Sequence, residues 1–225
     1  GRLAQRLPAD HPLSAFLAER QAWLALDDWR VSEAVEHFEK AVRTRQKSAE
    51  MGNLRSKFFI FFDQQGLAMA ERLRGREEEA QEYLESLSKS LAEALADEQR
   101  TSAKQRSQLR SRYLNTLERR ADSAVYGPGR PEDALPVLRT ALEFAKRNLD
   151  ENGPLDRHID RVRCKWILAR AAGGEDASAD LGLIEDEPSD TPLETKYRRL
   201  ARAAVGLAAG EPGQAQAVAD LVLGL

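Results

Sequence analysis

The chain has 225 residues, of which 42% are apolar and 32% are charged, and its formal net charge is only −3. This small charge provides no global field that would attract nucleic acid or a membrane surface, and no apolar run approaches the roughly 18–20 residues of a membrane span. The one cysteine, Cys164, excludes an internal disulfide. A lone cysteine is typical of a reducing compartment, so we expect a cytoplasmic protein.

The first half of the sequence predicts four helices, because good helix formers dominate and breakers separate the stretches of helical apolar spacing. The first is expected at 12–28, and the second begins near residue 32. A third is expected at 49–74, where Gly75 provides a C-cap. A fourth is expected at 76–98.

The second half predicts six more helices between clusters of glycine and proline, which stop one helix and start the next. They are expected at 103–126, 131–152, 155–172, 176–186, 190–209 and 211–225. The segment at 176–186 is rich in acidic residues. Consecutive helices joined by short turns predict a series of antiparallel hairpins.

An internal repeat appears when the second helices of these hairpins are aligned. Each copy has an alanine, a larger or apolar residue four positions on, and a further apolar residue three positions beyond it. The four copies are Glu33-Ala34-x-x-x-Phe38-x-x-Ala41, Glu79-Ala80-x-x-x-Leu84-x-x-Leu87, Asp133-Ala134-x-x-x-Leu138-x-x-Ala141 and Gln214-Ala215-x-x-x-Ala219-x-x-Val222. A small alanine lets two helices approach closely, so we expect all four alanines to lie at helix–helix contacts.

This pattern resembles the tetratricopeptide repeat family, whose second helix has the same alanine spacing after a glycine-centred turn. The resemblance implies an all-α fold: an α-solenoid of about five antiparallel helical hairpins, in one domain at 1–225, with the first helices lining a concave face. The repeats are longer than the family period of about 34 residues, so we expect longer helices. A compact bundle of the same hairpins is the alternative. The chain begins at Gly1 rather than methionine, and we expect it to be part of a longer protein.

Residues that could carry chemistry are sparse. His11, His37 and His158 have no spacing that would hold zinc with Cys164, and a buried, inert thiol is the better interpretation of that cysteine. The sequence has no phosphate-binding glycine loop of the P-loop type. We therefore predict no catalytic, cofactor-binding or metal-binding residues, and a protein that is not an enzyme.

The aromatic run Phe58-Phe59-Ile60-Phe61-Phe62 points nearly all round its helix. Core packing between several neighbours is the first interpretation. The alternative is an aromatic patch that faces a ligand, because Phe59 would lie off the main stripe.

Charge is segregated between the two kinds of helix. The first helices from 103–126 onward are net positive, whereas 76–98 and 175–187 are strongly acidic. The charges either pair between adjacent helices as salt bridges or form a basic groove that attracts an acidic peptide. For the groove, the predicted partner-binding residues are Arg106, Arg110, Arg112, Arg157, Arg161, Lys165, Arg198 and Arg202.

These observations predict a non-catalytic protein–protein interaction scaffold that binds an acidic peptide or partner surface through a basic concave face. The alternative is a helical sensor or arm of a larger multidomain enzyme or ATPase-type regulator. Nucleic-acid binding is weaker, because no aromatic residues interleave with Arg106, Arg110 and Arg112. The last helix is apolar on more than one face and includes Leu221 and Val222, so a homodimer through this helix is possible.

Overall fold

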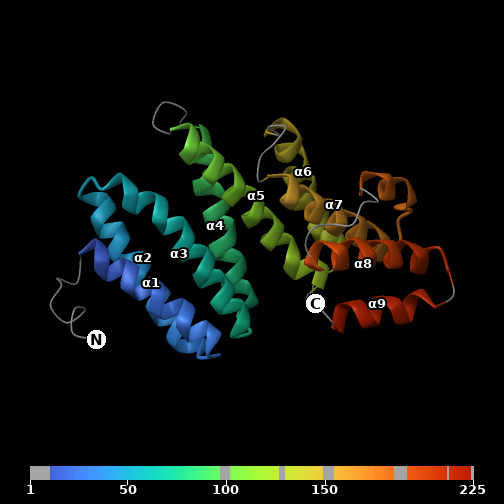
Figure 1. The fold of residues 1–225 in the computed structure, drawn as a ribbon, viewed down its shortest axis with the longest axis horizontal. Coiled ribbons are helices and arrows are strands. Elements are labelled where there is room, and N and C mark those ends of the chain that lie inside the picture. The colour runs from blue at the N-terminus through green and yellow to red at the C-terminus, as the bar shows by residue number, and fades with distance from the viewer. Residues whose placement is uncertain are drawn as a thin grey trace. The chain divides into compact units, whose positions relative to one another are not determined.

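The computed structural model describes residues 11–96, 102–126, 130–148, 155–184, 192–211 and 213–223, and every regular element within these ranges is helical (Figure 1). The chain divides into two compact units, Gly1–Glu93 and Ala94–Leu225. Each unit has its own buried apolar clusters. Of the helices in the described ranges, none is long and apolar enough to cross a membrane.

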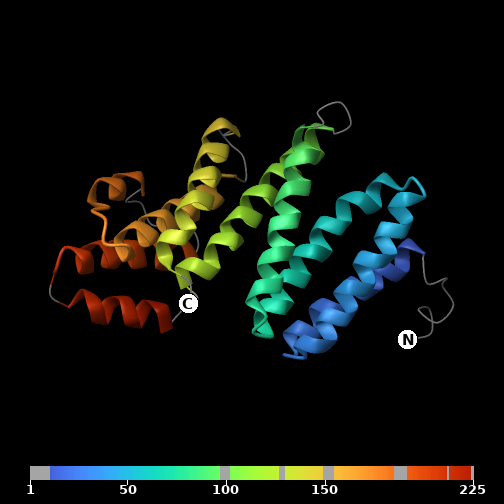
Figure 2. The same cartoon turned by 180° about the vertical axis from the view of Figure 1, so that it is seen from behind.

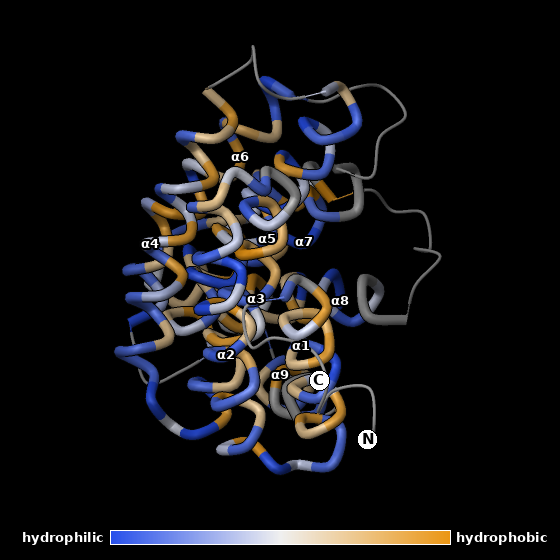
Figure 3. Tube along the Cα trace, turned by 90° about the vertical axis from the view of Figure 1, so that its left-hand side faces the viewer, coloured by the Kyte–Doolittle hydropathy of each residue, from blue (hydrophilic) through white to orange (hydrophobic). Residues whose placement is uncertain are grey.

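The first unit contains α1 (Pro12–Asp27), α2 (Val31–Glu50), α3 (Leu54–Leu73) and nearly all of α4 (Glu77–Ala96). Helix α2 packs against both α1 and α3, and these three helices lie side by side from either direction of view (Figures 1 and 2). Apolar and polar residues alternate along the helices (Figure 3), as expected when each helix buries one face.

The boundary between α2 and α3 differs from the sequence prediction. One helix was expected at 49–74, but α2 continues to Glu50 and α3 begins at Leu54. Gly52 between them has a φ of 91°, which glycine adopts without a steric penalty. The Asn53 side chain then accepts a hydrogen bond of 3.2 Å from the Ser56 N–H and caps α3. Gly52 therefore ends one helix and Asn53 caps the next, and the sequence prediction overlooked this pair.

Phe38 lies in the core of the first unit and is fully buried. Its ring meets the Trp23 ring edge to face, with 5.1 Å between the ring centroids. A Cβ atom at Gly66 would lie 2.4 Å from two atoms of the Phe38 ring, so glycine at this point of α3 makes room for the ring. The surrounding buried cluster comprises Ala22, Ala25, Leu26, Ala34, Val35, Leu67 and Ala70.

The second unit contains α5 (Ala103–Tyr126), the 3₁₀ helix η2 (Pro131–Ala134), α6 (Leu135–Asn148), α7 (Leu155–Ala172), the 3₁₀ helix η3 (Ser178–Leu183), α8 (Pro192–Ala208) and α9 (Gln214–Leu223). Helix α5 packs against η2, α6 and α7. Helix α7 also packs against α8, which in turn packs against α9. The described part of the unit is therefore a succession of neighbouring helices.

Two predictions for the second unit are wrong. The acidic helix expected at 176–186 is only the short helix η3 at Ser178–Leu183; residues 185–191 lie outside the described ranges. Ala215 was expected at a helix contact but is exposed. Helix α9 instead packs Val218 against the cluster formed by α7, η3 and α8. The other three repeat alanines, Ala34, Ala80 and Ala134, are buried as predicted.

Candidate ligand-binding pocket

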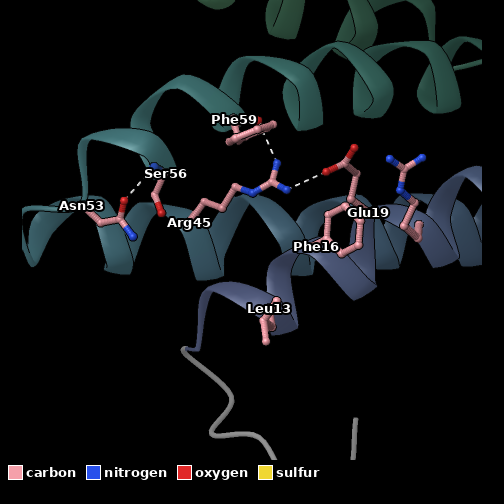
Figure 4. A pocket seen from close by; sticks show the side chains of 8 residues that line it. Leu13, Phe16, Glu19, Arg45, Asn53, Ser56 and Phe59 are labelled. Carbon is pink, nitrogen blue, oxygen red and sulfur yellow. Dashed lines mark hydrogen bonds and ion pairs between the residues drawn. The ribbon is translucent and has the colours of Figure 1, made fainter. Parts of the chain in front are cut away.

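A pocket lies between α1, α2 and the start of α3 in the first unit (Figure 4). Its volume is about 280 Å³. Its apolar walls are Leu13 and Phe16 of α1 and Phe59 of α3. Leu13 and Phe16 are 53% and 43% exposed, so the pocket has an apolar surface that the described side chains leave accessible to a ligand. The remaining lining residues are Glu19, Arg20, Arg45, Asn53 and Ser56.

Arg45 forms the charged floor of this pocket. Its side chain reaches from α2 between Glu19 and Phe59 (Figure 4). One terminal nitrogen donates to Asp63 Oδ1 at 2.7 Å and to the Phe59 carbonyl oxygen at 2.9 Å. The other donates to Glu19 Oε2 at 2.6 Å. The guanidinium also lies 4.9 Å from the centroid of the Phe59 ring, so Arg45 contacts the aromatic wall and both acidic side chains.

Two acidic side chains share the single charge of Arg45. Asp63 is fully buried, and its Oδ2 atom has no hydrogen-bond partner among the described residues. Burial raises the pKa of Asp63 most strongly. The charge of Arg45 lowers this pKa, the charge of Glu19 raises it further, and the resulting pKa is about 8. Asp63 therefore keeps its proton at neutral pH, and the floor consists of one cation, one carboxylate and one neutral acid.

Two polar groups at the rim remain available to a ligand. The Arg20 guanidinium lies 5.1 Å from the centroid of the Phe16 ring and is exposed. It forms no ion pair with any side chain in the described ranges. The Asn53 carbonyl oxygen caps α3, while its amide nitrogen has no partner in the same ranges. With a nearly neutral floor and Arg20 at the rim, the pocket favours an apolar group that lies next to an anion.

Several predicted partner-binding residues are committed to ion pairs inside the second unit. Lys165 is only 1% exposed, and its ammonium lies 2.8 Å from Glu118 Oε1 and also pairs with Asp122. Arg161 lies 3.3 Å from the same Glu118 oxygen. Arg198 is buried and pairs with Asp160. These contacts join α5 to α7 and α7 to α8, so the salt-bridge interpretation accounts for these three residues, and Lys165 cannot belong to an exposed basic face.

Glu118 is the anionic centre of that buried network. Burial would raise its pKa, but a hydrogen bond with His158 and the charges of Lys165 and Arg161 lower it to about 2. The Lys165 ammonium also lies 5.8 Å and 5.4 Å from the ring centroids of Tyr126 and Tyr197. Such a paired network stabilises the helix packing and offers no free charge to a partner.

The remaining predicted residues lie in different surroundings. Arg106, Arg110 and Arg112 are half-buried on α5. Arg202 is exposed on α8 and lines a groove against α9. Arg157 belongs to α7, but its side chain lies outside the part of the chain that the structure describes. Of the seven residues whose side chains the structure describes, Lys165 and Arg198 are buried, so these seven do not all belong to one exposed surface.

Other candidate chemistry can be placed as well. Cys164 is buried, which raises the pKa of its thiol to about 12; this thiol is inert. In the described ranges, no histidine, cysteine and carboxylate side chains cluster as metal ligands would. The residues from Phe58 to Phe62 are each half-buried, and Phe59 contributes to the pocket, in line with the ligand-facing alternative.

Sequence reasoning missed the charged floor of the pocket. Arg45 continues the buried stripe of Ala34, Phe38 and Ala41 by one further helical turn. An arginine at the core position of an amphipathic helix requires buried acidic partners. That signal was present, but the identity of the partners, Glu19 and Asp63, depended on how α1 and α3 pack against α2.

Comparisons with known proteins support the fold. No protein-family model matches the chain, and no curated protein matches it. A crystal structure of kinesin light chain nearly identical TPR-like repeats, from Podosopora anserina, is similar with a TM-score of 0.61. The two are 21% identical, and the match covers 95% of each chain. The predicted all-α helical repeat is confirmed: the chain has a tetratricopeptide-like helical repeat fold.

Proposed function

We propose that this chain is a non-catalytic scaffold that binds a peptide segment of a partner protein in the pocket between α1, α2 and α3. The segment inserts one bulky apolar side chain between Leu13, Phe16 and Phe59, and an acidic group next to that side chain pairs with Arg20. The observation that carries this proposal is the combination of apolar walls, of which Leu13 and Phe16 are exposed, with an arginine, Arg20, that has no ion pair to any described side chain.

The size of the pocket supports a side chain as the ligand. Cavities that enclose drug-sized molecules measure about 300–1,000 Å³, and this pocket has a volume of about 280 Å³. It therefore holds one large side chain, while the rest of the segment lies over the rim. The Asn53 amide nitrogen is placed to donate to a carbonyl oxygen of that segment.

The charged floor supports a peptide rather than a catalytic role. Arg45 donates short hydrogen bonds to Asp63 and to Glu19, so these side chains are held in place by one another and none of them is poised to attack a substrate. Through Arg45 these contacts link α1, α2 and α3 and hold Phe59 against the guanidinium. A preorganised pocket of this kind loses little conformational entropy when it binds.

Selection from a phage library of random 16-residue peptides tests the proposal. We expect the enriched peptides to combine a large apolar or aromatic residue with a nearby Asp or Glu. Synthetic copies of these peptides should bind at least tenfold more weakly to Phe59→Ala and to Arg20→Gln, measured by fluorescence anisotropy. The first change removes an apolar wall, and the second removes the cation at the rim.

Two exposed residues outside the pocket provide matched controls. Leu24 is 61% exposed on α1, and Arg43 is exposed on α2. Leu24→Ala and Arg43→Gln should bind the same peptides within about twofold of wild type. Equal losses in the pocket variants and in these controls would overturn the pocket assignment, as would enrichment of peptides that lack any apolar residue.

A further inference from the structure

Trp29 lies in the turn between α1 and α2, and 78% of its surface is exposed. Its φ is 58°, and no other residue except glycine has a positive φ in the described ranges. A bulky side chain in this left-handed region crowds its own backbone, so the conformation is rare for such a residue. The indole ring is therefore placed in solvent at a position that the local backbone disfavours.

Two other helix ends in the chain form the same turn with glycine at the equivalent position. After α1, the backbone N–H groups of Trp29 and Arg30 donate to carbonyl oxygens in the last turns of the helix at 2.9 and 2.7 Å. After α3 and α8, Gly75 and Gly210 replace the tryptophan in the same pair of hydrogen bonds, with φ values of 79° and 77°. Glycine is the usual residue at this position, so the turn itself does not require an indole ring.

The charges beside Trp29 favour a cation. Asp28 and Glu33 both pair with Arg30, whereas Asp27 is exposed and forms no ion pair with any side chain that the structure describes. The last turn of α1 contains no basic residue, although the carbonyl end of a helix carries a partial negative charge that a cation would stabilise. A carboxylate without a countercharge therefore lies two residues from the exposed ring.

We propose that the α1–α2 turn is a docking site for a segment of a partner protein that presents an arginine. The guanidinium stacks on the exposed face of the Trp29 ring and pairs with the Asp27 carboxylate. Arginine suits this site better than lysine, because its planar group both stacks on an aromatic ring and donates two hydrogen bonds to one carboxylate. Tryptophan is also enriched among the residues that contribute most to protein interfaces.

This docking site is separate from the pocket of the proposed function and does not depend on it. Leu13 and Phe16 of the pocket lie at the start of α1, whereas Trp29 follows its end. At a rise of about 1.5 Å per residue, roughly 20 Å of helix separates the two surfaces. A ligand of one surface therefore leaves the other accessible.

The acidic residues of the turn favour a basic protein segment over two other classes of partner that exposed tryptophan contacts. Tryptophan stacks on the bases of single-stranded nucleic acid, and it is also enriched at membrane interfaces. The carboxylates of Asp27, Asp28 and Glu33 would repel the phosphates of a nucleic acid and the headgroups of anionic lipids. An arginine side chain has the opposite charge and is attracted to the same surface.

Fluorine NMR of the full chain tests this proposal. The chain has three tryptophans, so 5-fluorotryptophan labelling gives three resonances, and that of Trp29 is the one absent from Trp29→Gly. The probe is a 12-residue Gly-Ser peptide with arginine at positions 5 and 8. We expect the probe to shift the Trp29 resonance and to leave those of Trp23 and Trp166 in place. The same peptide with glutamine at both positions should bind at least fivefold more weakly.

Variants measured by isothermal titration calorimetry separate recognition from folding. Trp29→Gly should abolish binding of the arginine peptide while the urea midpoint stays at or above that of wild type, because glycine adopts the left-handed conformation without steric cost. Trp29→Phe keeps an aromatic face and should bind within about fivefold of wild type. Asp27→Asn should weaken binding at least threefold, whereas Asp133→Asn, at an exposed position of the second unit, should bind as wild type does. Phe59→Ala in the pocket should also bind normally, so the two sites can fail independently.

Several results would overturn the proposal. An unmoved Trp29 resonance at millimolar arginine peptide, or equal binding of the arginine and glutamine peptides, would show that the turn does not recognise a guanidinium. A urea midpoint of Trp29→Gly clearly below that of wild type would assign the ring to the stability of the fold. A Trp29 shift with a 20-nucleotide oligo(dT), or with phosphatidylcholine vesicles containing 30% phosphatidylserine, but not with the arginine peptide, would assign the turn to nucleic acid or to a membrane surface.

Discussion

At the scale of single residues, the Arg45 cluster combines three titratable groups with one unsatisfied atom. Asp63 Oδ2 is buried without a hydrogen-bond partner among the described residues, and such an atom is costly when the carboxyl group is ionised. Retention of the proton removes most of that cost, which is why burial raises the pKa of Asp63 so strongly. This cluster should therefore make the stability of the first unit depend on pH.

The sign of that dependence follows from proton binding. An aspartate in the unfolded chain loses its proton near pH 4, whereas Asp63 in the folded chain keeps it to a pKa of about 8. Between these values the folded state binds more protons, so the free energy of unfolding falls as the pH rises. We expect the free energy of unfolding of Asp63→Asn to decrease less steeply as the pH rises. Urea unfolding followed by tryptophan fluorescence at pH 5, 6, 7 and 8 measures it.

Asp27 on α1 is exposed, so Asp27→Asn is the matched control for that experiment. For Asp27→Asn, the slope of the free energy of unfolding against pH should equal that of the wild type. If Asp63→Asn kept the full wild-type slope as well, Asp63 would have to be ionised in the folded protein at neutral pH.

Glu118 should produce the opposite dependence in the second unit. Its folded pKa of about 2 lies below the unfolded value, so its contribution to stability is present above pH 4.5 and is lost as the pH falls toward 2. Glu118→Gln should lower the melting temperature at pH 7, because it leaves Lys165 buried without one of its two carboxylate partners. Circular dichroism melts at pH 7 and pH 3 should show a smaller difference between variant and wild type at pH 3.

Gly66 is important because of one contact, in which its backbone leaves room for the Phe38 ring. A methyl group there would overlap the Phe38 ring, and overpacking of a core typically costs about 1–3 kcal/mol. We expect Gly66→Ala to lower the urea midpoint accordingly. A methyl group at Gly182 would meet no atom within 4 Å, so Gly182→Ala should leave the midpoint nearly unchanged. A Gly66→Ala midpoint equal to wild type would mean that Phe38 can move aside freely.

At the scale of the elements, the repeat alanines show that the same motif position can be buried in one helix and exposed in another. Ala34 and Ala80 are fully buried, and Ala134 is 1% exposed. Ala215 occupies the equivalent sequence position in α9 but is exposed, because no further helix in the described ranges packs against that side of α9. The same motif therefore has a different environment at the end of the described array.

This difference gives a direct comparison between two substitutions. Ala80→Leu forces extra volume into a packed contact and should cost about 1–3 kcal/mol of stability. Ala215→Leu should cost less than about 0.5 kcal/mol, as is usual for surface changes. Denaturation midpoints of the two variants test the register of both helices. Equal midpoints for the two variants would contradict it.

At the scale of the whole molecule, the composition of α9 raises the question of self-association. The sequence of α9 contains one charged residue, Asp220, among mostly apolar residues, and exposed apolar patches often mark contacts between proteins. We expect a concentration-dependent dimer, detected by analytical ultracentrifugation, that Leu221→Glu weakens. Gln216→Glu, at an exposed position on the same helix, is the control. A wild type that stays monomeric at high micromolar concentration would contradict this expectation.

The sequence by itself determined the helical repeat, most helix boundaries and the inert state of Cys164, because apolar spacing and glycine or proline breakers act locally. It also indicated that Phe59 could face a ligand. Only the tertiary structure decided which charges are available. Lys165 and Arg199 both belong to basic helices of the second unit, yet Lys165 is buried between two carboxylates whereas Arg199 is exposed on α8. The side on which neighbouring helices pack makes this difference, and that packing depends on contacts between residues far apart in the sequence.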